Sequence, residues 1–418
     1  MREVNLLAIR RGEWLAVGLS TAYFFCLLCA YFTLRPIRES MAVASGSVTV
    51  PVLFTGTFVV MALMVPVFGY LFSRFPKRVF LPASYGFFIL NLLVFYWAFR
   101  SFSDTLWLGR AFFIWISVFN MFVVSVFWSF MTDLFKPGQA RRLFGLIAAG
   151  GSAGAVAGPA LTAALAPALG IANLFLVAIG FLSLALLCQI LLLRRQEAEA
   201  GGRAPAIGGS VWAGAQLVWK TPMLRLMVGV LVMLPVLNTV LYNQQIALVE
   251  QVYAGQDPTR FFALIDLGAN VTAFTLELLL TSRLLRWLGV AKTIIIMPLL
   301  TSVGLVLLAI WPQVAVLGVF QALRRGGEYG LMKPARELLY TQVEPEVRYK
   351  AKNFIDTFIY RGGDLTSGWL YLGLSQGLGL GIAAIAWLAA PLGGLWAWLA
   401  YRLGLNFKEP EHDPEHSG

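Results

Sequence analysis

The sequence has few of the residues that carry out chemistry. Its 418 residues include only two histidines, His412 and His416, and both lie in the polar C-terminal tail. The sequence contains no G-x-x-x-x-G-K-[ST] loop, the backbone cradle that many ATP-hydrolysing proteins place around phosphates. We therefore predict that this protein is not an enzyme and that it holds no metal or cofactor.

Cysteine is also scarce. Cys26, Cys29 and Cys188 are the three cysteines, and each lies in an apolar run. Free cysteine in such surroundings behaves as a small hydrophobic residue. We expect packed or lipid-facing thiols and no disulfide framework.

Charged residues make up only 13% of the chain, whereas 59% of the residues are hydrophobic and the mean hydropathy is +0.75. A soluble fold cannot hide so much apolar surface, so the expected surrounding is a lipid bilayer. The net charge of +11 could indicate nucleic acid. The basic residues instead form short clusters between apolar runs, so we expect no nucleic-acid partner.

Apolar runs of roughly 20 residues, the length at which a helix crosses a bilayer core of about 30 Å, recur along the chain. They predict an all-α membrane protein with twelve transmembrane helices. The spans lie near 14–38, 50–72, 79–99, 107–132, 144–168, 171–193, 223–247, 260–281, 291–311, 314–336, 351–374 and 380–403.

Basic residues are unevenly distributed among the predicted loops. With the N-terminus inside, 24 of the 32 Lys and Arg residues fall on the inner side, while Arg100, Arg110 and Arg260 fall near outer helix ends. This bias predicts a multi-pass protein of a bacterial inner (cytoplasmic) membrane, with both termini cytoplasmic. No small-residue cleavage site follows the first apolar run, so we expect a retained helix and not a signal peptide.

The chain divides near its midpoint at a Gly-, Ala- and charge-rich stretch. We predict an N-terminal six-helix bundle (1–193), a cytoplasmic linker (194–222), a second six-helix bundle (223–404) and a polar cytoplasmic tail (405–418). The halves resemble one another, because Arg74 and Arg283 stand in similar segments 209 residues apart, and Pro137 and Pro345 are 208 apart. Two agreeing offsets favour duplicated, pseudo-symmetric bundles, which transporters use to build a midplane site.

The loop GYLFSRFPKR (69–78) resembles the signature that the major facilitator superfamily carries between its second and third helices, G-x-x-x-D-R-x-G-R-R. Ser73 replaces the Asp and Pro76 the Gly. The resemblance implies a gate at the inner surface, and positive-inside charge is the structural alternative. The candidate gating residues are Gly69, Arg74, Lys77, Arg78, Asp133, Arg142 and Arg283. Gly150, Gly151, Gly154, Gly158 and Pro159 resemble the superfamily's G-x-x-x-G-P element, for which close helix packing is a sufficient explanation.

Ionisable residues also occur inside the predicted spans, where they are costly and mark functional sites facing a polar cavity. Arg35 and Arg38 share a face of the first span, and Arg324 and Arg325 lie near the midplane of the tenth. Asp266, Asn270 and Glu277, and likewise Asn238, Tyr242 and Gln245, are spaced to form polar helix faces. The candidate substrate-binding residues are Arg35, Arg38, Asn238, Tyr242, Asp266, Asn270, Arg324, Arg325, Glu328, Arg361 and Asp364.

Two interpretations of these charges remain open. The arginines could pair with Glu39, Glu328 and Asp364 and only hold helices together. Alternatively, their planar donors bind the phosphate or carboxylate of an anionic substrate. The acidic residues would then carry protons or be displaced by the substrate.

TLRPIRES in the first span and ARELLYTQVEPEVRYKAKNFIDTFIYRGGD after the tenth resemble elements of the Tlc-type ATP/ADP translocases, a branch of major facilitator-like transporters. The resemblance places Arg38 where that branch has a substrate-binding lysine. It aligns Glu337, Tyr340, Lys350, Lys352, Ile355, Asp356 and Arg361 with a second series of motifs. Asp364 stands where the family has a lysine, which changes the local charge by two.

The sequence therefore predicts a secondary active transporter of the major facilitator fold, working by alternating access. Its partners would be an anionic, phosphorylated or carboxylated small molecule, including nucleotides as candidates, the lipid bilayer, and protons as a candidate coupling ion. We expect a monomer. A channel is disfavoured by the duplicated halves. The alternative is a proton-coupled exporter or flippase of lipids or amphipathic compounds on the same fold.

The predicted topology can be tested by cysteine labelling. In Pro205→Cys, the new thiol lies in the predicted cytoplasmic linker, so a membrane-impermeant maleimide added to intact cells should leave it unlabelled. Strong labelling from outside would refute this orientation, and labelling after permeabilisation is the positive control.

Overall fold

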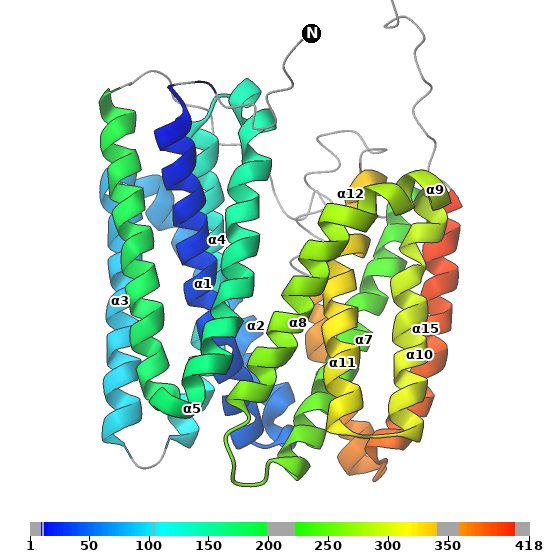
Figure 1. Cartoon of the computed structure of the whole chain (residues 1–418). Coiled ribbons are helices and arrows are strands. Elements are labelled where there is room, and N and C mark those ends of the chain that lie inside the picture. Colours follow the sequence, from blue (N-terminus) through cyan, green and yellow to red (C-terminus); the bar gives the residue numbers. More distant parts are fainter. Residues whose placement is uncertain (1–9, 11, 103–104, 199–221, 341–358, 406–418) are drawn as a thin grey trace, which may run out of the picture. The chain divides into compact units, whose positions relative to one another are not determined.

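The computed structural model describes residues 10, 12–102, 105–198, 222–340 and 359–405. These residues form helices joined by short connections (Figure 1). In the first half, α1 (Trp14–Ala44) leads through a 3-10 turn, η1 (Ser47–Thr49), to α2 (Val50–Arg74), α3 (Lys77–Ser101), α4 (Leu106–Leu134) and α5 (Pro137–Ala198). The 62-residue α5 is interrupted at Gly170, so it contains both the fifth and the sixth predicted spans.

The second half begins with α7 (Pro222–Val252), α8 (Thr259–Thr275), the π segment η2 (Leu276–Leu280), α9 (Thr281–Ile294) and α10 (Ile296–Ile310). It continues with α11 (Val314–Gly327), the π segment η3 (Glu328–Met332) and α12 (Lys333–Tyr340). After residues 341–358, which lie outside the described part, come α14 (Tyr360–Leu372), the π segment η5 (Gly373–Gly377) and α15 (Ile382–Leu405). Two of the predicted spans, 260–281 and 314–336, thus contain a π-helical segment, and η5 overlaps the end of a third, 351–374. Hydrophobic length does not reveal this feature.

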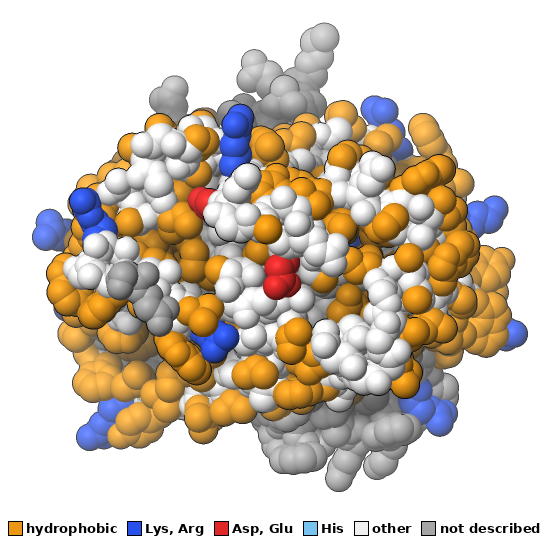
Figure 2. Space-filling model, turned by 90° about the horizontal axis from the view of Figure 1, so that it is seen from below, with side chains coloured by type: hydrophobic (Ala, Val, Ile, Leu, Met, Phe, Trp, Pro, Cys, Tyr) orange, Lys and Arg blue, Asp and Glu red, His pale blue; other side chains and the backbone are white. Residues whose placement is uncertain are grey.

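The predicted fold class, an all-α membrane protein, is confirmed. Within the described residues, eight helices are long and apolar enough to cross a membrane, and the shorter Ile296–Ile310 is also apolar. The stretch Arg142–Arg195 extends over 54 residues, enough for two crossings. Large apolar side chains such as Leu63, Trp97 and Trp287 are exposed, and Figure 2 shows hydrophobic side chains over much of the visible surface. Such a surface is suited to lipid.

Contacts divide the chain into two compact units. Unit 1 comprises Met1–Ala206 and Ile246–Asn270, and unit 2 comprises Ile207–Gln245 and Val271–Gly418. The end of α7, the following loop and most of α8, which we call the 246–270 hairpin, therefore group with the helices of the first half. The predicted linker, 194–222, is helical up to Ala198 and otherwise lies almost wholly outside the described residues.

Two pairs of glycines with a positive φ are separated by the same number of residues. Gly46 (φ 84°) and Gly255 (φ 78°) are 209 residues apart, as are Gly170 (φ 74°) and Gly379 (φ 65°). A positive φ is costly for residues with a Cβ, so each glycine marks a turn that other residues would strain. The offset equals that between Arg74 and Arg283. The repeat seen in the sequence is therefore matched by the backbone of the turns.

The glycines of α5 allow it to pack closely on α1, and these two helices make the most extensive contact of any pair of described elements. A Cβ on Gly150 would collide with Thr21, one on Gly154 with the backbone of Phe25, and one on Gly158 with that of Cys29. The packing role expected for this stripe thus accounts for its small residues.

Cys26 and Cys29, spaced C-x-x-C on α1, are free and buried.

A buried polar network ties three helices of unit 1 together. The Tyr23 hydroxyl donates to the Tyr85 hydroxyl (2.6 Å), and Gln189 Nε2 donates to the Tyr23 hydroxyl (3.0 Å). All three side chains are fully buried among Phe112, Phe119, Phe127 and other aromatic rings. In such surroundings a polar group left without its partner is costly.

Removing the central hydroxyl tests the network. Tyr23→Phe leaves Gln189 Nε2 without that acceptor and should destabilise the protein by about 1–3 kcal/mol, read as a lower Tm in detergent. The Tyr23→Phe/Gln189→Leu double variant removes both partners and should recover part of the loss. Tyr96→Phe removes a hydroxyl that accepts from the exposed Arg100, so it is the control and should change the Tm little. An equal fall in Tm for both tyrosine variants would contradict the network's role.

Candidate functional site

The intramembrane charges of unit 1 begin on α1. Pro36 lies inside this helix, between Arg35 and Arg38. Arg35 Nη1 lies 3.4 Å from Asp266 Oδ1, and Asp266 is almost fully buried. Arg38 Nη2 lies 3.5 Å from Glu39 Oε1, and its guanidinium stacks over the ring of Phe113 at 4.5 Å from the centroid. Both arginines are thus held by a carboxylate, and Arg38 also by a cation–π contact.

The 246–270 hairpin is tied to this region by polar contacts. The Ser40 hydroxyl donates to Asp257 Oδ1 (2.8 Å), which also accepts from the backbone N–H and the hydroxyl of Thr259 at the start of α8. The N–H of Ser47 donates to Glu250 Oε2 (2.9 Å). Asn270 Nδ2 donates to the carbonyl oxygen of Ala155 (2.8 Å). Asp266 and Asn270 therefore belong to a set of hydrogen bonds and ion pairs that connect α8 to the first-half helices.

Sequence reasoning did not identify Ser40, Glu250 or Asp257 as part of this set. These three residues lie near predicted helix ends, where polar residues are common. Their residue types and positions therefore gave no sign of a special role. Glu277, expected on one face with Asp266 and Asn270, lies in the π segment η2, is exposed, and groups with unit 2. The expected face assumed a continuous α-helix, and a π turn changes the angular spacing.

The main polar cluster of unit 2 is arranged around Arg324, whose side chain is only 7% exposed. Its Nε donates to Gln321 Oε1 (3.0 Å), and its Nη1 donates to Asn238 Oδ1 and lies 3.4 Å from Glu328 Oε2. Gln321 Nε2 in turn donates to Gln245 Oε1 (2.8 Å). A chain of hydrogen bonds thus surrounds a buried guanidinium, as a buried charge requires.

Arg361 and Asp364 form a second pair on α14. Arg361 Nη1 lies 3.6 Å from Asp364 Oδ2, a loose contact, and the Arg361 side chain is 41% exposed whereas that of Asp364 is 19% exposed. The Thr239 hydroxyl donates to Asp364 Oδ1 (3.2 Å). Asn238 Nδ2 lies within hydrogen-bond reach of Glu328 Oε2 (3.3 Å) and of the Tyr360 hydroxyl (3.4 Å), so it connects the first pair to α14.

Two local features bring α7, α11 and α14 together. A Cβ on Gly363 would collide with the ring of Pro235, so the absence of a side chain lets α14 approach α7. The π segment η3 begins at Glu328, directly after the two arginines of α11. π turns often occur at functional sites because they redirect side chains. Tyr242 and Arg325, two further predicted site residues, are half-buried in unit 2.

The predicted gating residues lie at the ends of helices. Gly69 and Arg74 are on α2, Arg74 being its last residue, Lys77 and Arg78 open α3, Asp133 lies in the last turn of α4, and Arg283 is on α9. Arg74, Arg78 and Arg283 are exposed. Arg142 on α5 donates to Glu13 Oε1 (3.0 Å), which also accepts from Gln139 Nε2 (2.9 Å). Of the translocase-like residues, Glu337 and Tyr340 are on α12, whereas Lys350, Lys352, Ile355 and Asp356 lie outside the described residues.

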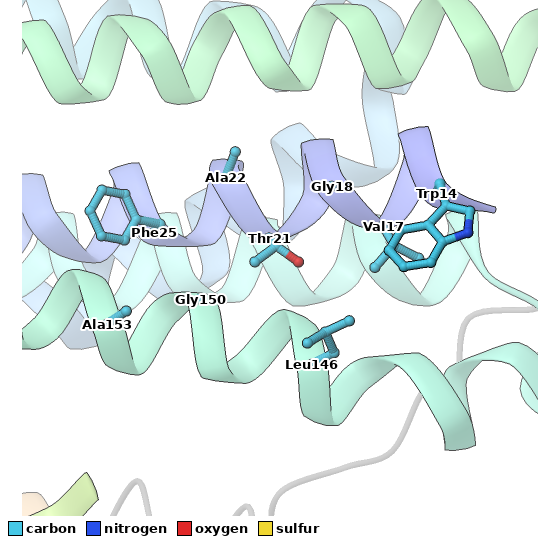
Figure 3. A pocket seen from close by; sticks show the side chains of 9 residues that line it. All are labelled: Trp14, Val17, Gly18, Thr21, Ala22, Phe25, Leu146, Gly150 and Ala153. Atoms are coloured by element: carbon cyan, nitrogen blue, oxygen red, sulfur yellow. The ribbon is translucent and has the colours of Figure 1, made fainter. Parts of the chain in front are cut away.

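Unit 1 also has a groove of about 580 Å³ between α1 and α5 (Figure 3). Its lining is Trp14, Val17, Gly18, Thr21, Ala22, Phe25, Leu146, Gly150 and Ala153. Space remains beside Gly18, where an added Cβ would meet no atom within 4 Å, and no charged side chain is among these lining residues. The groove therefore suits an apolar chain.

Comparison with known proteins identifies the type of fold. The profile of the Major Facilitator Superfamily matches residues 15–335. No curated protein matches the chain by sequence. Among solved structures, an auto-inhibited POT family peptide transporter is similar at 14% identity and a TM-score of 0.63, over 95% of this chain and 98% of the other.

Two further structures are similar over most of their length. The nucleoside transporter NupG shares 12% identity with a TM-score of 0.60, over 96% of this chain and 100% of that one. A bacterial homologue of the iron transporter ferroportin, in an inward-facing state, shares 15% with a TM-score of 0.62, over 95% and 100%. At such identities the likeness shows the fold and no particular substrate.

Glu13, just before α1, supplies a pH-dependent contact. The backbone N–H of Arg10, the Gln139 amide and the Arg142 guanidinium together lower the pKa of Glu13 from 4.5 to about 2. The ionised form is therefore favoured by folding. The contribution of the ionised Glu13 to the free energy of unfolding is fully present above pH 4.5 and is lost as the pH falls towards 2.

Glu13→Gln isolates this contribution. At neutral pH the variant should have a lower Tm than the wild type, and the difference should shrink on acidification from pH 4.5 towards 2, because only the wild type loses the ionised contact. Thermal unfolding in detergent at a series of pH values measures the difference. A constant difference across that range would show that Glu13 acts through packing and not through its charge.

Proposed function

The chain belongs to the Major Facilitator Superfamily, and from that premise we propose that it moves an anionic metabolite across a bacterial inner membrane. As a member of this family it is a secondary transporter. The proposed cargo carries a phosphate or a carboxylate, and the proposed driving process is exchange or proton coupling. Alternating access between two bundles around a midplane site would carry the cargo across.

The observation that supports an anionic cargo is the exposure of the Arg361 side chain together with its long contact with Asp364. This guanidinium lies inside a helix of a membrane protein, yet it is 41% exposed and its contact with Asp364 is 3.6 Å long. Arg324, by contrast, is enclosed and bonded to Gln321 and Asn238. A guanidinium offers two parallel donors to a carboxylate or phosphate. We therefore assign cargo binding to Arg361 first and a supporting role to Arg324.

The carboxylates beside the arginines support a coupled cycle. Asp364 and Glu328 each lie next to an arginine at 3.4–3.6 Å, and Asp266 lies next to Arg35 in unit 1. An arriving anion competes with these carboxylates for the guanidinium. The carboxylates restore the arginine contacts when the cargo leaves, so the empty transporter does not hold an unpaired charge at membrane depth.

The translocase-like residues support including nucleotides among the cargo candidates. Arg38 and Arg361 have the cationic character that the resemblance implies. Asp364 stands where those translocases have a lysine, so we expect this chain to favour fewer negative charges than ATP or ADP carries. Asp364→Lys should shift its preference towards more highly phosphorylated compounds.

A second candidate function, the export or flipping of lipids or amphipathic compounds, is favoured by the apolar groove between α1 and α5. An acyl chain would fit its lining. Competition by lipids in the uptake assay below distinguishes this function from the first.

The principal test is Arg361→Ala in proteoliposomes. Uptake or counterflow is measured in competition with nucleotides, sugar phosphates, dicarboxylates and lipids, and affinity is measured by thermal shift. One charge-assisted hydrogen bond is worth about 1.5–3 kcal/mol, so the variant should lose about 10- to 150-fold in affinity for the anion that competes best.

Arg402→Ala is the matched control, because Arg402 is an exposed arginine that stacks on Trp398 near the end of α15. Its affinity should be unchanged. If Arg361→Ala keeps wild-type affinity for every anion tested and only lowers the Tm, the intramembrane charges are structural and the anion site is refuted.

A further inference from the structure

The apolar groove of unit 1, between α1 and α5, is a cavity that the proposed anion transport does not use. We propose that it holds one acyl chain of an anionic phospholipid, which stays with the protein as a resident ligand and is not its cargo. This inference goes beyond the proposed function, because Arg361 and the other proposed cargo residues are not among the lining residues. Four features of the groove carry it: its length, its width, its closed end and its charged end.

The length of the groove matches the depth of one leaflet of a bilayer. Figure 3 shows Trp14 at one end and Phe25 with Ala153 at the other. Trp14 is the first residue of α1, and the stretch from there to Phe25 extends about 16 Å along the helix. Half of a hydrocarbon core of about 30 Å is about 15 Å. A chain that enters beside Trp14 therefore fills the groove over the depth of one leaflet.

The groove is too narrow for a helix. Spread over about 16 Å, its volume of about 580 Å³ gives a mean cross-section of about 36 Å². A helix with its side chains is about 10–12 Å in diameter and needs roughly 80–110 Å². A transmembrane helix of a partner protein or of a second copy therefore does not fit, whereas a single hydrocarbon chain does. Apart from Thr21, the lining consists of apolar side chains and glycines, which suit such a chain.

Helix packing closes the deep end of the groove. Just beyond Ala153, a Cβ on Gly154 would collide with the backbone of Phe25, and one on Gly158 with that of Cys29. From this level on, α1 and α5 are in close backbone contact, and the apolar space does not continue between them. A transport path must open at both ends, whereas a groove closed at one end retains its ligand. The closed end therefore favours a resident lipid over one that is flipped.

The other end of the groove has residues that suit a lipid headgroup. Trp14 is 51% exposed, and tryptophan is enriched where headgroups meet the hydrocarbon core. Four residues earlier, Arg10 is exposed, and its described contacts are made by its backbone. Its guanidinium has the planar donors that bind a phosphate. The carboxylate of Glu13 is bonded to Arg142 and Gln139, so it is not a strong competitor for Arg10.

Gly18 gives the sharpest test of the groove. A Cβ there would meet nothing within 4 Å, so Gly18→Leu puts a side chain into the groove and leaves the packing of α1 on α5 in place. Gly86→Leu on α3 is the matched control, because Gly86 is a helical glycine that also has open space but does not line the groove. Both variants gain the same helix propensity. Ala22→Leu, at another lining position, is a second way to fill the groove.

The measurement counts bound lipid. The full-length protein is purified from membranes in a mild detergent, and native mass spectrometry counts the phospholipids that stay bound. Thermal shift with added phosphatidylglycerol or phosphatidylcholine gives the affinity for each headgroup. We expect the wild type and Gly86→Leu to retain phosphatidylglycerol, and both groove variants to lose it, with an affinity lower by about 10-fold or more. The Tm without added lipid shows whether each variant is folded.

Arg10→Gln tests the headgroup. It removes the charge but keeps the backbone N–H that donates to Glu13. One basic residue near a membrane surface contributes about fivefold to the binding of an anionic lipid. The variant should therefore lose about fivefold in affinity for phosphatidylglycerol and keep its affinity for phosphatidylcholine. Arg100→Gln, at an exposed arginine of α3, makes the same change of charge and should bind both lipids as the wild type does.

Three results would overturn the inference. If the wild type retains no lipid, or Gly18→Leu retains as much as Gly86→Leu, the groove holds no lipid. If both headgroups bind equally and Arg10→Gln changes neither affinity, the lipid is not selected by its charge. If the wild type moves fluorescent phosphatidylglycerol across proteoliposome bilayers faster than Gly18→Leu does, the lipid is cargo, as in the second candidate function. Anion uptake is a separate measurement, so a failure of the anion site would leave lipid retention in the groove unchanged.

Discussion

The cost of placing ionised groups at membrane depth is the constraint on which the functional part of this structure depends. In four ion pairs of the two described clusters, the arginine lies 3.4–3.6 Å from its carboxylate. Arg324, the most enclosed, also has amide partners on two helices. Pairs at such distances are looser than hydrogen-bonded ion pairs. Each pair keeps its charges compensated without fixing the two side chains as firmly as a short ion pair would.

Helix packing supplies the close approach that such pairing needs. Side chains reach across helices only where the backbones come near. In unit 1 the glycines of α5 let it lie against α1, and in unit 2 Gly363 lets α14 lie against Pro235 of α7. The second contact places Asp364 beside Thr239 and Tyr360 beside Asn238. Small residues thus determine which polar groups can meet, although they make no polar contact themselves.

The 246–270 hairpin is held by polar contacts of the same kind. It lies in the second half of the sequence but groups with the first, through contacts made by Asp257, Glu250, Asp266 and Asn270. Polar ties of this kind are individually weak and can be exchanged for water, unlike the apolar packing of α1 on α5.

The sequence by itself determined the membrane class and the positions of the helices, because hydrophobic length and charge distribution are local properties that a bilayer reads directly. It also indicated the duplicated halves and the pairs Arg324–Glu328 and Arg361–Asp364, since residues three or four apart on a helix must lie on one face. Only the tertiary structure decided which helices share a polar network, through Thr239, Gln321 and Tyr360, and that Asp266 groups with unit 1 but Glu277 with unit 2. These contacts depend on crossing geometry and on π turns, which arise from packing between distant segments and leave no periodic signal along the chain.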